Sequence, residues 1–95
     1  MRIDIGTTGG GQVSNTNDQV LTIEFHARSS NAGPAYVGGS EVGVGNGREL
    51  TPDGSVAISF AQAGMDDHAG RELFSSFYVV VGAAGDKVDW VAILK

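Results

Sequence analysis

The sequence predicts a single small all-β domain, an antiparallel β-sandwich or jelly-roll-like barrel of about seven short strands. Three observations support this prediction. The chain of 95 residues contains 15 glycines, and they lie mostly between apolar runs, where tight turns need a permissive backbone. Apolar and polar residues alternate with a period of two in several segments, whereas helical periodicity is rare. Turn signals recur every ~8 to 12 residues, as in sandwiches and barrels.

The head of the chain differs from the rest. Residues 1–19 are expected to form a flexible N-terminal arm with a first short strand, and residues 20–95 the β-sandwich domain. Such an arm is either disordered or held by a neighbour, so Ile3 and Ile5 are candidate arm contacts. The glycine-rich stretch 6–11 is similar to a phosphate-binding loop, but no Lys-Ser or Lys-Thr pair follows it. Nucleotide binding is therefore not expected.

Residues 20–28 give the clearest strand. Apolar side chains at every second position alternate with Thr, Glu, His and Arg, which indicates one buried and one solvated face. Turn residues follow at 29–33, and an extended segment at Tyr36-Val37 completes a predicted hairpin.

The middle of the chain predicts further strands and turns. Val42 and Val44 indicate a thin strand before the Asn46-Gly47 turn, which is a strong hairpin signal. A second turn is expected over 49–54, followed by a one-sided strand over 56–60.

The two most apolar runs, 73–81 and 88–94, predict an antiparallel pair joined by the loop 82–87. Both faces of these runs are apolar, so we expect them in the middle of a sandwich or against another subunit. Packing in the core is the alternative role for the single tryptophan. The candidate interface residues are aromatic or aliphatic: Tyr36, Phe74, Phe77, Tyr78, Trp90 and Ile93.

Composition and side-chain chemistry argue against several function classes. Cysteine is absent, which excludes disulfides, thiolate metal sites and cysteine nucleophiles. A net charge of -5 with six scattered Lys and Arg residues argues against nucleic acid and anionic membranes as partners. The one local cluster of possible metal ligands, within residues 65–72, lacks the pattern of a calcium loop. We therefore expect no catalytic residue, no metal and no cofactor, and no export by a signal peptide.

A series of landmarks runs from Leu21 to the end of the chain. It comprises Ile23-Glu24-Phe25, Gly33-Pro34-Ala35-Tyr36-Val37-Gly38-Gly39, Leu50-Thr51-Pro52-Asp53-Gly54, and a closing pair of apolar runs separated by Gly85-Asp86-Lys87. This order resembles a module of small virion proteins of tailed bacteriophages, over about three quarters of the chain. The resemblance implies a β-sandwich on the phage particle, as a capsid decoration or cement protein, a head-fibre base, or a neck or tail accessory.

We therefore expect a non-enzymatic structural protein of the virion, above all a capsid decoration protein that binds the assembled shell. Its expected partners are the major capsid protein or another virion protein and further copies of itself, with a trimer favoured. One alternative is a carbohydrate- or receptor-binding sandwich in which Trp90 or Tyr36 is exposed. Another is a small hydrolase that uses Asp66, Asp67 or Glu72 near His68.

Overall fold

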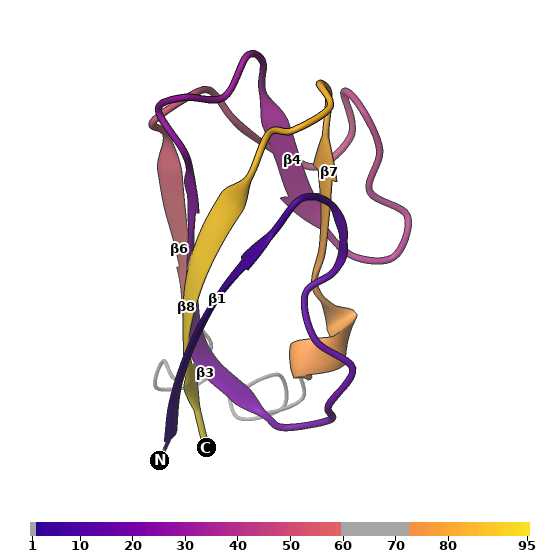
Figure 1. The fold of residues 1–95 in the computed structure, drawn as a ribbon. Coiled ribbons are helices and arrows are strands. Elements are labelled where there is room, and N and C mark those ends of the chain that lie inside the picture. The colour runs from indigo at the N-terminus through magenta and orange to yellow at the C-terminus, as the bar shows by residue number, and fades with distance from the viewer. Residues whose placement is uncertain (1, 60–72) are drawn as a thin grey trace.

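The protein is an eight-stranded β-sandwich in the computed structural model, which describes residues 2–59 and 73–95 (Figure 1). The first sheet has the order β1 (Arg2–Thr8), β8 (Val88–Leu94), β3 (Val20–Ala27) and β6 (Ser55–Ser59). The second has the order β2 (Gly11–Gln12), β7 (Tyr78–Val81), β4 (Ala35–Gly38) and β5 (Arg48–Leu50). A single 3-10 turn, η1 (Phe74–Ser76), precedes β7 in the described chain. The prediction of an all-β sandwich is confirmed.

The order of the strands is that of a jelly roll. Four of the antiparallel pairs are nested in the sequence, namely β1 with β8, β2 with β7, β3 with β6, and β4 with β5. This nested pairing arises when one long hairpin of eight strands rolls up into two facing sheets. Consequently the short connections after β1, β3, β5 and β7 cross between the sheets at one end, and both termini lie at the other end (Figure 1).

Two predicted hairpins are wrong for the same reason. The apolar runs that become β7 and β8 do not pair, because β8 lies between β1 and β3 while β7 lies between β2 and β4. Likewise β3 and β4 belong to different sheets. Alternation identifies a strand and separates its two faces, but it does not say which strand lies beside it. The Asn46-Gly47 hairpin joins β4 to β5, although Val42 and Val44 lie in its loop and form no strand.

The core lies between the sheets, and the alternation in the sequence places its side chains there. In β8, and in β3 from Ile23 onward, every second residue is buried, whereas a register shift between Val20 and Thr22 leaves Leu21 half-buried. Four aromatic rings fill the interior: Phe74 packs edge-on against Trp90 at 5.1 Å between ring centroids, and Phe25 lies 6.1 Å from Phe77. The buried apolar surface that these residues remove from water is the main stabilising contribution to a domain of this kind.

The N-terminal residues contribute a strand to each sheet. All seven residues of β1 pair with β8 in an uninterrupted register from Arg2↔Leu94 to Thr8↔Val88. Gly6, which the sequence assigned to the arm, is part of this strand. Gly10 and Gly11 have φ values of 126° and 103°, which residues with a side chain rarely adopt. They connect β1 to β2 in the other sheet.

Two buried polar side chains hold the crossing loops together. The carboxylate of Asp86 accepts hydrogen bonds from the backbone N–H groups of Ala32 at 2.8 Å and Gly33 at 3.1 Å. The amide of Asn31 donates to the carbonyl of Lys87 at 2.8 Å and accepts from its N–H at 2.9 Å. These bonds join the β3–β4 and β7–β8 loops, so two buried polar groups are satisfied and the end of the sandwich is closed. Among the described residues, the structure has no helix long and apolar enough to cross a membrane.

Candidate interaction surface

The outer face of the first sheet carries an apolar cluster on β1 and β8. The register places Ile3 opposite Ile93 and Ile5 opposite Val91, and the strand alternation sends all four side chains away from the core. Ile3 is 61 % exposed, Ile5 71 % and Val91 39 %, while Ile93 is half-buried. We call these four residues the outer quartet. Directly opposite residues on neighbouring strands have contacting side chains, so the quartet forms one continuous patch.

The inner face of β1 explains why its isoleucines point outward. Gly6 lies over the indole of Trp90, and a Cβ at Gly6 would come within 2.3 Å of the ring. No side chain fits between this strand and the tryptophan. The other inner positions of β1 are occupied by polar residues. Arg2 forms an ion pair with Asp18, and Asp4 and Thr8 are half-buried. The only large apolar residues of the strand are therefore left on the outside.

A polar row borders the outer quartet. Thr7 on β1, Asp89 on β8 and His26 on β3 lie side by side on the same face. Arg28 contacts Asp89 through its Nε at 3.1 Å and its Nη2 at 3.0 Å, and the hydroxyl of Thr7 donates to the same carboxylate. The hydrogen bond from Arg28, followed by that from Thr7, holds the pKa of Asp89 below its usual value. The hydrogen-bonded charges of this row lie at one end of the face, and Glu24 of β3, opposite Val91, adds an exposed carboxylate beside the quartet.

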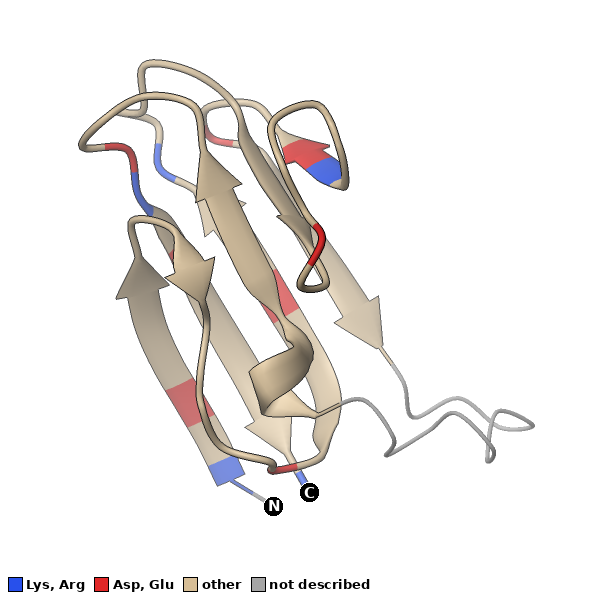
Figure 2. Ribbon diagram, turned by 90° about the vertical axis from the view of Figure 1, so that its right-hand side faces the viewer, with Lys and Arg blue, Asp and Glu red and all other residues tan. Residues whose placement is uncertain are grey.

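The free edge of β1 lies beside the quartet. Strands β1 and β6 are the two margins of the first sheet, and β2 and β5 those of the second. Figure 2 shows β1 at the left margin of the sandwich, with no other described strand beyond it. With seven residues, β1 is longer than β6 with five, β5 with three and β2 with two. It therefore presents the longest row of unpaired backbone groups among the described strands.

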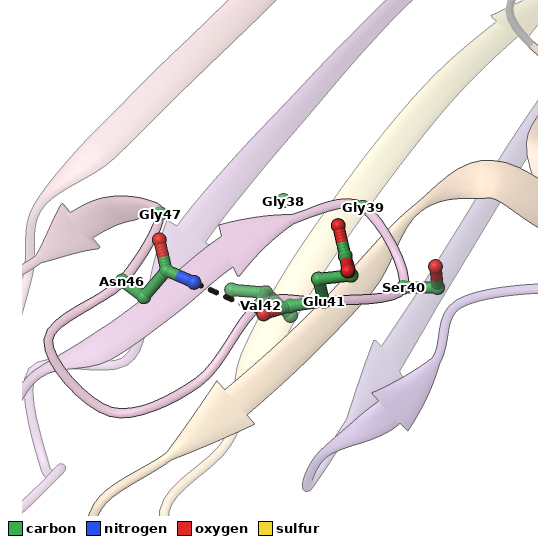
Figure 3. Close-up of a pocket in the computed structure, with 7 residues that line it drawn as sticks. All are labelled: Gly38, Gly39, Ser40, Glu41, Val42, Asn46 and Gly47. Carbon is green, nitrogen blue, oxygen red and sulfur yellow. Dashed lines mark hydrogen bonds between the residues drawn. The ribbon is translucent and has the colours of Figure 1, made fainter.

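A second feature is a shallow hollow in the β4–β5 loop (Figure 3). It has a volume of about 380 Å³ and is lined by Gly38, Gly39, Ser40, Glu41, Val42, Asn46 and Gly47. The Asn46 amide, which donates to the carbonyl of Glu41 at 3.0 Å, serves to close the loop. Glu41 is the one ionisable residue in the lining, so the hollow lacks the paired acid and base that hydrolysis needs. No group of three or more His, Cys, Asp or Glu residues gathers in the described part of the chain.

The structure divides the interface residues that the sequence indicated. Phe74, Phe77 and Trp90 are core residues, with exposures of 1 %, 6 % and 8 %. Their assignment to an exposed interface is corrected because Phe74 and Trp90 pack against each other, and Phe77 against Phe25, inside the sandwich. Tyr36 is only 9 % exposed, and Tyr78 is half-buried on the second sheet.

The remaining predicted residues come together. Ile93 and the candidate arm contacts Ile3 and Ile5 are neighbours in the outer quartet. Val91 was missed, although it shares the alternation phase of Ile93 and that signal would have found it. The acidic residues and His68 within 65–72 lie outside the described residues.

Comparison with known proteins adds no relative: no family model, no curated protein and no solved structure matches this chain.

Proposed function

We propose that this chain is a non-enzymatic structural protein that binds other proteins through the outer face of its first sheet. The observation that carries the proposal is the outer quartet, two cross-strand apolar pairs in which three of the four side chains are exposed, next to a free strand edge. Single exposed apolar residues are ordinary on protein surfaces, but contiguous ones mark contact sites, because their burial is favourable. We infer that the outer quartet serves association with another protein, because a small fold gains stability when a partner covers its exposed apolar residues.

The finer part of the proposal is a capsid decoration or cement protein of a tailed bacteriophage, bound to the major capsid protein. It is supported by the order of sequence landmarks from Leu21 onward. The jelly roll is compatible with this role, since it recurs in viral capsid proteins, but it also occurs in lectins and enzymes. The fold alone therefore does not select the function.

The carbohydrate-binding alternative has lost its main support. It required Trp90 or Tyr36 as an exposed platform on which a sugar ring stacks. Both rings are at least nine-tenths covered by the protein itself. A sugar could reach neither ring face without opening the sandwich, so the protein-binding surface is the better candidate.

The test is co-sedimentation with capsid shells. The chain is expressed together with the proposed partner, the major capsid protein from the same genome, and shells are separated from free protein on a gradient. We expect the wild-type chain to sediment with the shells in a fixed ratio. The double variant Ile3→Thr/Ile5→Thr should bind about a hundredfold more weakly, since burying an isoleucine contributes about 1.5 to 3 kcal/mol.

Val44→Thr is the matched control, because Val44 is 71 % exposed, as Ile5 is, but lies in the β4–β5 loop. This variant should sediment like the wild type. A wild-type chain that stays at the top of the gradient would refute the decoration role. An equal loss for Val44→Thr would refute the assignment of the surface.

A further inference from the structure

The edge of β1 lacks most of the features by which proteins prevent strand edges from pairing. Natural edges are protected by short length, proline, lysine, bulges or inward-pointing charges. This strand has seven residues, contains neither proline nor lysine, and keeps an unbroken register with β8. Its two charged residues point inward, and one of them, Arg2, is already neutralised by Asp18. Such an edge can accept another strand.

We propose that β1 pairs antiparallel with β1 of a second copy, with the two-fold axis passing beside Ile5. This inference goes beyond the proposed function, because self-association and shell binding can each occur without the other. The backbone supplies the hydrogen bonds, and the identical edges make the contact isologous. The result is a closed dimer with one continuous sheet, not an open filament.

The residue pattern of β1 selects the register. Directly opposite residues share a face, so the outward residues must face one another. Only a pairing centred on Ile5 uses all seven residues of the strand. It places Asp4 opposite Gly6 of the second copy, where no side chain competes for space.

Other registers are less favourable. Centring the pair on Asp4 sets two carboxylates directly opposite each other, which is destabilising. Centring it on Ile3 leaves only three residues of each strand in the ladder, since β1 begins at Arg2. The register centred on Ile5 has the most backbone hydrogen bonds and no opposed like charges.

This pairing also unites the two outer quartets. A row of four apolar side chains would cross the joined sheets, from Val91 and Ile5 of one copy to Ile5 and Val91 of the other. The patch available to a shell would double in size. A two-fold dimer differs from the trimer favoured on sequence grounds, because antiparallel pairing of identical edges always has two-fold symmetry.

Cysteine cross-linking tests the register, since the natural chain has no cysteine. Antiparallel residues directly opposite each other have Cα atoms about 4.5 or 5.5 Å apart, within the range that a disulfide spans. In a buffer of reduced and oxidised glutathione, Ile5→Cys should form a linked dimer at least about tenfold faster than Val44→Cys, whose residue is equally exposed. Light scattering should give twice the monomer mass for the unmodified protein.

Two further variants fix the alignment. Ile3→Cys alone should link no faster than Val44→Cys, but a mixture of Ile3→Cys and Thr7→Cys should link rapidly, because these positions are opposite in the proposed pairing. Fast self-linking of Ile3→Cys would overturn the register. A monomeric mass together with no excess linking of Ile5→Cys would overturn the dimer, and shell binding by such a monomer would leave the proposed function standing.

Discussion

The two margins of the first sheet, β1 and β6, have opposite polarity. In β6 the apolar residues Val56 and Ile58 face the core, and the exposed outer positions are small or polar. In β1 the inner positions are polar or glycine, and the two isoleucines are on the outside. Both strands alternate with a period of two, and they lie at opposite margins of the molecule (Figure 2). An alternating strand therefore need not turn its apolar side inward.

The neighbour under each strand decides the direction. Trp90 extends beneath β1 and occupies the space that an inward isoleucine would need. The side chains of β6 have room at the core, where they pack against buried residues. The protein interior is packed at close to crystal density. Where one strand contributes a large inward side chain, the neighbouring strand must therefore contribute a small residue at the same place.

Gly6→Val would break this arrangement most strongly. The new side chain must displace the indole of Trp90, whose nearest atom lies 2.3 Å from the ideal Cβ. We expect a loss of about 3 kcal/mol in the free energy of unfolding, as for a severe overpacking change. Urea denaturation measures this loss, and a change in tryptophan fluorescence should accompany it.

Gly39→Ala is the control for that substitution. A Cβ at Gly39 meets nothing within 4 Å, so the loss should stay below about 1 kcal/mol. Equal losses for the two glycine variants would show that Trp90 does not support β1 in this way.

A pair of isoleucine truncations sharpens the comparison of the edges. Ile58→Ala removes a partly buried side chain that packs on the core, and it should cost about 1 to 2 kcal/mol. Ile5→Ala removes a side chain that is mostly in solvent, and it should change the stability of the monomer by less than about 0.5 kcal/mol. Thermal and urea unfolding at low protein concentration give both values, and the reverse order would contradict the assigned faces.

The smallest effect concerns the polar row that joins the two margins. The pKa of Asp89 is lowered by Arg28 and Thr7, so its ionised form stabilises the fold. This contribution is present above the unfolded pKa of about 4 and is lost as the pH falls through the lower folded value. Asp89→Asn should reduce stability by less than about 1 kcal/mol at neutral pH, because the groups are partly solvated.

The pH series provides the check. The difference in melting temperature between wild type and Asp89→Asn should shrink as the pH is lowered below about 4. Asp53 lies 3.0 Å from the Nε2 atom of His26 in the polar row and is largely exposed. Asp53→Asn changes only this exposed contact, so it should have a smaller effect at neutral pH. A difference for Asp89→Asn that persists unchanged at low pH would show that packing, not charge, is responsible.

The candidate surface was only partly predictable. Ile3 and Ile5 were predicted as contacts of an N-terminal arm, and Ile93 as an interface residue because both faces of its run are apolar; all three share a patch. Phe74, Phe77 and Trp90 were predicted on the same ground as Ile93, and they are buried. Hydrophobicity alone does not separate an interface residue from a core residue, because both avoid water in the final assembly.

The all-β class, the strong alternation of β3 and β8, and the turn between β4 and β5 could be predicted from the sequence, since these depend on local spacing and backbone freedom. The neighbours of each strand and the solvent-facing side of β1 could not be predicted and are known from the three-dimensional structure. Those outcomes depend on contacts between residues far apart in the chain, above all Gly6 with Trp90. A local sequence pattern does not predict these contacts, because the space that a side chain fills is defined by residues distant in the chain.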